Sequence, residues 1–367
     1  GGRNTNNAYF SSGCFDSEDV WYTAFASKSR EIMDSRALYG CDMVYKALFS
    51  DHLYKSAYIY FSENCTTSYF LYDCRNCIDC FGCVNLRNAK SCIFNVQYSK
   101  EDYDAFIQEL LPFKRSLLTQ LENKFWDLVK VTPMNASRNT NIKDTYGVLL
   151  YDMGSSFSTT HSHRSFNVRY AEAALSHKDS MDLLFSGGSS HNLYMTTNIG
   201  SQSSNVKFSV SSKVSSDSEF IFNSRNLSNC FMCFGLQNKS YCILNKQYTQ
   251  DEYWKIVDEI KVALLENGEY ADGLGMGFSA EAYNFSLGQI SFPLTKEEIT
   301  SLGGYSAKDP ESNAKDVEII SASLLPDSID EVTDDICTKA IACTETGRPF
   351  KITPSELAFY RKMKLPL

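Results

Sequence analysis

Residues 80–103 read CFGCVNLRNAKSCIFNVQYSKEDY, and residues 230–253 read CFMCFGLQNKSYCILNKQYTQDEY, so the sequence contains one stretch twice. Without a gap, 11 of the 24 positions are identical at an offset of 150 residues. Arg75-Asn76 matches Arg225-Asn226 in the same register. Upstream, the likeness continues only as a pattern of aromatic triplets. The chain therefore contains two copies of one unit, followed by a different tail.

Each copy contains a shorter period. Apolar triplets recur within each copy, and each triplet is separated by 22 residues from the next but one. Ser, Asn, Asp and Gly lie between the triplets and suit tight turns. A period of this length is typical of a solenoid, and we expect two short strands in each 22-residue turn of a parallel β-helix. The triplets centre on Ile59, Leu71, Phe81 and Ile93 in the first copy, and on Ser209, Ile221, Phe231 and Ile243 in the second.

A predicted helix follows each copy. Ser99 to Asp102 and Thr249 to Glu252 read as capping boxes, and apolar residues follow both at helical spacing. A further helix is predicted over about Arg115 to Val129. Because the end of a solenoid exposes strand edges, we interpret these helices as caps. The predicted fold is mainly β with helical caps: two tandem short parallel β-helix (solenoid) units, each closed by amphipathic helices, plus a small α+β tail.

Four segments follow from this pattern. The stretch around Pro133 links the two units, and glycines from Gly268 onward indicate loop. Thr353-Pro354-Ser355-Glu356 is a strong helix start near the end of the chain. The predicted domains are solenoid unit 1 with capping helices (1–133), solenoid unit 2 with a capping helix (134–267), a loop-rich connector (268–335) and a small zinc-ribbon-like or β-turn-helix tail (336–367).

Composition limits the function. The net charge of -9 argues against generic nucleic-acid binding by this region. No run of 18 apolar residues exists, so we expect no membrane span. The odd count of 13 cysteines favours reduced thiols in a cytoplasm over a disulfide framework, although a signal segment removed from the chain is the alternative. The lack of a starting Met favours a fragment or a processed form.

Cys74, Cys77, Cys80 and Cys83 form a C-x2-C-x2-C-x2-C run that resembles a zinc or iron–sulfur ligand set. The second copy has Ser224, Leu227, Cys230 and Cys233 at these positions, and Leu cannot ligate a metal. We therefore favour small core residues and expect no bound cofactor, with zinc or redox pairing as alternatives. The predicted structural core is Phe81, Cys83, Cys92 and Ile93, with Phe231, Cys233, Cys242 and Ile243.

Weaker signals remain open. His161 and His163, with His177 or His191, form either a metal site or a polar loop. Cys337 and Cys343 belong either to an incomplete zinc ribbon or to free thiols. A polysaccharide-acting β-helix enzyme would use acidic residues along one sheet, but Asp is also an ordinary turn residue. The candidate acids are Asp34, Asp42, Asp51, Asp73 and Asp79, and the tyrosines for stacking on sugars or a partner are Tyr39, Tyr45, Tyr54, Tyr58 and Tyr60.

The tail and the repeated stretch resemble a group of uncharacterised cysteine-rich, zinc-finger-associated proteins of candidate-phyla (Parcubacteria-like) bacteria. Residues 343–367 (CTETGRPFKITPSELAFYRKMKLPL), 292–298 (FPLTKEE) and 80–103 carry the likeness, which covers about two-thirds of the chain. The resemblance implies a bacterial origin and zinc fingers with C-x2-C pairs outside this region. It implies no reaction.

The leading functional prediction is a non-enzymatic scaffold that associates with itself or with a protein partner. It rests on the duplicated unit, the missing catalytic motifs and the many aromatic residues. The first alternative is a nucleic-acid-associated zinc protein, and the second is a polysaccharide-acting β-helix enzyme.

Overall fold

The computed structural model describes most of the chain as two compact units, and the protein is mainly β, with parallel sheets and few helices. Unit 1 combines Gly1–Met134 with Pro310–Leu367, and unit 2 is Asn135–Asp309. The described residues are 3–135, 140–143, 146–154, 157–163, 177–184, 188–200, 202–272, 275–279, 281–286, 288–289, 292–308 and 317–367.

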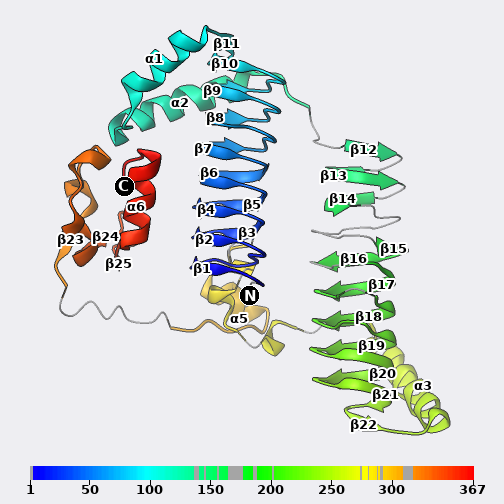
Figure 1. Cartoon of the computed structure of the whole chain (residues 1–367). Coiled ribbons are helices and arrows are strands. Elements are labelled where there is room, and N and C mark those ends of the chain that lie inside the picture. Colours follow the sequence, from blue (N-terminus) through cyan, green and yellow to red (C-terminus); the bar gives the residue numbers. More distant parts are fainter. Residues whose placement is uncertain are drawn as a thin grey trace. The chain divides into compact units, whose positions relative to one another are not determined.

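The sheet of unit 1 is parallel from β1 to β10, and Figure 1 shows these strands stacked one upon the next. Only the last pair, β10 with β11, is antiparallel. Its strands are β1 (Asn6–Tyr9), β2 (Glu18–Trp21), β3 (Ala24–Ser27), β4 (Arg30–Met33), β5 (Arg36–Tyr39), β6 (Asp42–Asp51), β7 (Tyr54–Tyr60), β8 (Tyr69–Tyr72), β9 (Ile78–Val84), β10 (Lys90–Ile93) and β11 (Val96–Gln97).

The register shows a 12-residue repeat, because Glu18 pairs with Arg30, Arg30 with Asp42 and Asp42 with Tyr54. The predicted 22-residue turn is wrong. Ile59 and Leu71 are true register partners in adjacent layers, but Phe81 pairs with Tyr69 and belongs to another position of the repeat. The 22-residue spacing from Ile59 to Phe81 is the sum of one full layer, from Ile59 to Leu71, and a step of 10 residues from Leu71 to Phe81, which occupies a different position of the repeat.

The backbone has positive φ at every third residue through most of unit 1. Asparagine tolerates this left-handed conformation because its short side chain bonds locally. All asparagines between residues 3 and 98 except Asn6 lie at such positions, as do Gly13, Gly40 and Gly82. A Cβ on Gly82 would lie 2.5 Å from the ring of Phe94, so this bend also needs the absence of a side chain.

Small side chains fill the inward positions, which also recur at every third residue. Ser56, Ser68 and Cys80 are one such column, and all three are fully buried. The Ser56 hydroxyl donates to the Tyr54 carbonyl at 2.9 Å and accepts from the Ser68 amide at 3.3 Å. The Ser68 hydroxyl accepts from the Cys80 amide at 3.1 Å. Inward serines therefore satisfy buried backbone amides between layers, which would otherwise destabilise the fold.

An asparagine terminates each sheet. The Asn95 side chain accepts from the Val84 amide at 2.8 Å and donates to the Val84 carbonyl at 2.9 Å. Asn245, its counterpart in the second copy, makes the same two bonds to Phe234 at 2.9 and 2.8 Å. The amide side chain thus replaces a strand at the last layer and covers its open backbone groups.

Unit 2 repeats this design. Its layers also follow a 12-residue register from β18 onward, whereas one extra residue separates the paired positions of β17 and β18. The strands are β12 (Thr140–Lys143), β13 (Tyr146–Gly154), β14 (Phe157–His163), β15 (His177–Lys178), β16 (Met181–Leu184), β17 (Ser190–Thr197), β18 (Ser204–Val210), β19 (Ser216–Phe222), β20 (Arg225–Phe234), β21 (Gln237–Ile243) and β22 (Lys246–Gln247).

The predicted helices form with Ser99 and Thr249 at their N-caps, although only Thr249 makes the full predicted capping box. The Ser99 hydroxyl accepts from the Asp102 amide, and Thr249 forms a full capping box with Glu252. In unit 1, α1 contacts β10 while α2 contacts β8 and β9; in unit 2, α3 contacts β21. The helices are α1 (Lys100–Leu110), α2 (Arg115–Val131), α3 (Gln250–Glu266), α5 (Lys296–Ser301) and α6 (Pro354–Met363), with 3-10 turns at Met276–Phe278, Tyr283–Phe285, Ala322–Leu324, Ile329–Glu331 and Asp334–Thr338.

The tail shares the core of unit 1, although the sequence predicted a separate domain over 336–367. The rings of Trp21 and Phe359 lie 5.8 Å apart, and Lys362 pairs with Glu31 at 2.6 Å. Strand β24 (Ala340–Ala342) pairs in parallel with β23 (Ile319–Ser321) and antiparallel with β25 (Pro349–Phe350). Contacts such as that of Lys362 with Glu31 join opposite ends of the chain, so no local pattern in the sequence shows them.

We predict that Asn95→Gly will destabilise the end of the first sheet. Glycine keeps the backbone conformation at φ +66° but removes both bonds to Val84, so exchange of the Val84 amide should accelerate about tenfold or more. Hydrogen exchange detected by mass spectrometry measures this effect.

The matched control is Asn88→Gly, at φ +54°, which removes only an exposed bond to Asn76. Equal exchange of the Val84 amide in the two variants would contradict the terminating role of Asn95.

Candidate functional site

The four-cysteine run forms one complete set of inward positions. Cys74, Cys77, Cys80 and Cys83 are fully buried and unbridged. Each thiol donates to a backbone carbonyl, as the serines of neighbouring layers do: Cys74 to the Cys83 carbonyl at 3.4 Å and Cys83 to the Cys92 carbonyl at 3.5 Å. The thiols therefore act as small, weakly polar core residues.

The thiols also contact one another. The Cys77 thiol forms hydrogen bonds with the thiols of Cys65, Cys74 and Cys80. The bond to Cys77 and burial raise the pKa of the Cys74 thiol, and bonds to Cys77 and Cys83 together with burial raise the pKa of the Cys80 thiol. Hydrogen bonds to Cys65, Cys74 and Cys80 lower the pKa of the Cys77 thiol, and a hydrogen bond to Cys80 lowers that of Cys83, so the pKa values of the four thiols shift in opposite directions. Within the described ranges, no group of three or more His, Cys, Asp or Glu side chains is placed to hold a metal ion.

The second unit has the same inward arrangement with other side chains. Ser224, Leu227, Cys230 and Cys233 are all buried. The Ser224 hydroxyl donates to the Phe222 carbonyl at 2.8 Å, which is the type of bond that the equivalent Cys74 makes to Tyr72 at 3.6 Å. All residues of the predicted structural core are buried: Phe81, Cys83, Cys92, Ile93, Phe231, Cys233, Cys242 and Ile243.

The remaining metal candidates do not form a described cluster. His177 is buried, and His191 is exposed on the next strand, one residue away from the register partner of His177. The side chains of His161 and His163 lie outside the described residues. In the tail, Cys337 and Cys343 are half-buried and unbridged.

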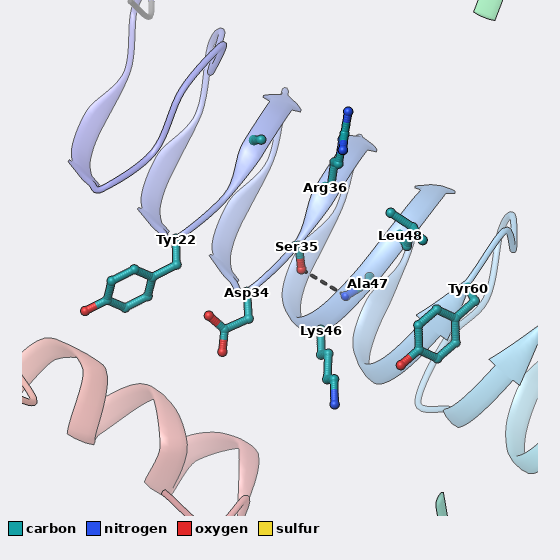
Figure 2. A pocket seen from close by; sticks show the side chains of 9 residues that line it. Tyr22, Asp34, Ser35, Arg36, Lys46, Ala47, Leu48 and Tyr60 are labelled. Carbon is teal, nitrogen blue, oxygen red and sulfur yellow. Dashed lines mark hydrogen bonds between the residues drawn. The ribbon is translucent and has the colours of Figure 1, made fainter. Parts of the chain in front are cut away.

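A shallow hollow of about 420 Å³ lies on one side of unit 1 (Figure 2). Tyr22, Asp34 and Lys46 are successive outward residues of one column and point to the same side, as Figure 2 shows. Burial raises the pKa of Asp34, while Tyr45 and Lys46 partly oppose this effect. Its lining is Tyr22, Ala24, Asp34, Ser35, Arg36, Lys46, Ala47, Leu48 and Tyr60. Asp34 is thus the one carboxylate among the described residues that line this hollow.

The other candidate acids lie in different columns, and three of them form ion pairs. Asp42 pairs with Arg30 at 3.0 Å, and Asp73 pairs with Arg87 at 3.3 Å. Asp79 pairs with Lys100 at 3.4 Å. Residues of one column are separated by multiples of 12 residues. No two of the predicted acids, Asp51 included, have this separation, so they do not stack in one column. The structure therefore does not bring the predicted acids together.

The predicted tyrosines divide between packing and exposure. Tyr58 stacks on Phe70 with ring centroids 4.4 Å apart, and Tyr60 contacts Trp126 of α2 at 5.1 Å. Tyr45 packs against Tyr360 of α6 at 5.7 Å. Tyr39 and Tyr54 are exposed. Tyr60 and Tyr45 therefore pack α2 and α6 against the sheet, whereas Tyr58 packs on a neighbouring strand.

Sequence reasoning missed two features. Glu219 is a buried carboxylate that pairs with Lys261 at 2.9 Å and Lys207 at 3.3 Å, and accepts from the Tyr270 hydroxyl at 3.0 Å. Burial acts to raise the pKa of Glu219, but the lysines and Tyr270 outweigh it, so the pKa is lowered. Glu219 therefore fixes α3 and the following turn to the sheet.

The second missed feature is an exposed aromatic cluster on the first layers of unit 1. Phe10 lies 4.7 Å from Tyr9 and stacks on Tyr22 at 6.2 Å between ring centroids. Phe10 is 78% exposed, which is unusual for a side chain of this size. The signal for this cluster was present as aromatic residues near the start of the chain, but their exposure depends on where the layers end.

Comparison with known proteins gives no family. No family model matches the chain, and no curated protein matches it. Among solved structures, an acetyltransferase candidate from Desulfovibrio desulfuricans G20 is 12% identical over 73% of this chain and 81% of its own, with a TM-score of 0.14. A UDP-N-acetylglucosamine acyltransferase from Campylobacter jejuni is 7% identical over 72% and 88%, with a TM-score of 0.11. Scores this low carry no argument, and the resemblance to the candidate-phyla group stays a prediction.

We predict a fixed order of thiol reactivity. Hydrogen bonds from the Thr346 side chain and from the backbone of Thr346 and Glu345 lower the pKa of the Cys343 thiol, whereas burial raises the pKa of the Cys337 thiol. Because the thiolate is the nucleophile, iodoacetamide at pH 7 should modify Cys343 first, Cys337 next, and the thiols of Cys74 to Cys92 only on unfolding. Peptide mass spectrometry over a time course measures the order.

Rapid modification of Cys80 or Cys83 in the folded protein would contradict the burial of this layer. Cys343→Ser is the control, because it should remove only the fastest phase.

Proposed function

We propose that the protein is a non-enzymatic β-solenoid scaffold that associates with itself through the outer edge of β1. In this proposal the 12-residue repeats close into two short β-helices, and the amphipathic helices cover their apolar sides and last layers. The exposed aromatic cluster beside β1 is the observation that carries it.

The edge of β1 has the properties of an association surface. All four of its residues are exposed, and among the described strands it pairs with β2 alone. The Asn6 amide donates to Ser17 and the Tyr9 carbonyl accepts from Tyr22, so part of the backbone is used within the unit. The remaining groups of this strand offer donors and acceptors to another strand edge. Tyr9, Phe10 and Tyr22 add apolar area, and aromatic residues are enriched at interfaces.

Other functions have less support. A glycosidase requires two carboxylates about 5–10 Å apart across a sugar-binding cleft. The hollow beside Asp34 offers one carboxylate among its described lining residues, and a second hollow of about 610 Å³ is lined by Asp16 and Glu18 together with the cations Lys28 and Arg30. The proposed scaffold needs no zinc, because the inward thiols donate to carbonyls as the serines do. A reducing cytoplasm would keep these thiols as they are. No helix of the described chain is long and apolar enough to cross a membrane.

We predict that the chain exceeds its monomer mass of 41.4 kDa in light scattering at micromolar concentration. The double variant Tyr9→Ser/Phe10→Asn should return the mass to that of a monomer, because it removes the aromatic area while Asn tolerates the positive φ of position 10.

The control variant is Val131→Ser, which removes an equally exposed apolar side chain from the end of α2 and should leave the mass unchanged. A wild-type monomer at all concentrations would refute self-association.

A further inference from the structure

The two units differ in what covers one side of their sheets. In unit 1, the outward column Tyr60, Tyr72 and Val84 lies beneath α2. The ring of Trp126 lies 5.1 Å from Tyr60 and 6.1 Å from Tyr72. Asn85 donates to the Pro133 carbonyl beyond the helix end at 3.1 Å. Val84 is only 1% exposed as a result.

The equivalent column of unit 2 is apolar and more exposed, with only Phe222 half-buried. Val210, Phe222 and Phe234 stand 150 residues after their counterparts and share their register. Val210 is 37% exposed, Phe234 65%, and Leu244, the counterpart of the half-buried Phe94, 69%. The column has thus kept apolar side chains without the helix that covers them in unit 1, although Val210 is smaller than Tyr60 and Phe234 is larger than Val84.

No second helix follows α3 in the described part of the corresponding segment. The counterpart of α2 would span residues 265–281, which read LENGEYADGLGMGFSAE. Its glycines disfavour a helix. The described part of this segment holds the last two residues of α3 and the short turn Met276–Phe278. Tyr270 covers Phe208 and Phe220 instead, at 5.5 and 6.4 Å between ring centroids.

The charges beside the column differ as well. In unit 1, Arg75 pairs with Glu63 at 3.7 Å, and Arg87 with Asp73 at 3.3 Å. At the equivalent positions of unit 2, Lys213 replaces Glu63, Asn223 replaces Asp73 and Gln237 replaces Arg87.

Both carboxylates are therefore lost on this side of unit 2. Lys213 and Arg225 are register partners in adjacent layers, and both are exposed. Two stacked cations beside an apolar strip favour an anionic ligand over a neutral one.

We propose that this exposed face, formed by Val210, Phe222, Phe234 and Leu244 beside Lys213 and Arg225, binds an amphipathic helix of a partner protein. The helix has an apolar stripe like that of α2 and carries carboxylates on the flank that meets the two cations. The template is the chain itself, because α2 covers the same column in unit 1. The inference rests on the proposed role as a scaffold, but it concerns a surface apart from the β1 edge.

The test uses the full chain and a fluorescein-labelled peptide with the sequence of residues 114–132, in which Lys124→Glu and Lys130→Glu add carboxylates. Fluorescence anisotropy gives the dissociation constant. We expect saturable binding that weakens at least tenfold for Phe234→Ser and for Arg225→Glu. Binding to the wild type should fall with added salt, and this fall should be less steep for Arg225→Glu.

The control variant Val262→Ser removes an exposed apolar side chain from α3 and should bind the peptide as the wild type does. Circular dichroism of each variant checks the fold, and Phe234→Leu is a milder second variant that should weaken binding less than Phe234→Ser.

Three outcomes overturn the proposal: no binding to the wild type, equal binding to wild type and Phe234→Ser, or loss of self-association in Phe234→Ser, which would make a second copy the occupant. The Tyr9→Ser/Phe10→Asn variant should still bind the peptide, so failure of self-association and failure of helix binding are distinguishable.

Discussion

The structure depends on a bend at every third residue. Each bend places one residue at positive φ and the next residue inward, so each 12-residue layer brings the chain back into register with the layer before it. The cost of left-handed backbone at many non-glycine positions, about 1 kcal/mol or more each, must be offset by the packing and hydrogen bonding between layers. Asparagine and aspartate reduce that cost, which explains why they occupy so many of the bends.

A repeat this short also determines what its core can contain. Inward positions hold Ser, Thr, Cys, Ala, Val, Ile or Leu, while Phe, Tyr and Trp point outward and gather under the helices. Cysteine and serine are interchangeable there because both donate to nearby carbonyls. In such a fold, a run of four cysteines at this spacing is better interpreted as one layer of small inward side chains than as a set of metal ligands. The outward columns are free to differ, and the two units differ in what packs on those columns.

Local signals in the sequence predicted local structure well. The duplication, the helices after each copy and their N-cap residues, Ser99 and Thr249, were all readable from the sequence. The 12-residue repeat was not, because the apolar triplets that stand out are centred on two different columns: Ile59 and Leu71 point inward, whereas Phe81 and Ile93 point outward. Long-range features also escaped. Glu219 has Tyr69 as its counterpart, so the comparison of copies gave no signal for it, and packing of Phe359 on Trp21 joins opposite ends of the chain.

Cross-linking of paired cysteines tests the 12-residue layer most directly. Ser27 and Tyr39 are register partners, so their Cα atoms should lie about 4.8 Å apart, within the reach of a disulfide. The double variant Ser27→Cys/Tyr39→Cys should form an intramolecular disulfide on mild oxidation of the folded protein, as read by peptide mass spectrometry. Ser27→Cys/Phe49→Cys, with a spacing of 22 residues, should not, because its two sites lie about two layers apart. Rapid bridging of the second pair and none of the first would contradict the 12-residue layer.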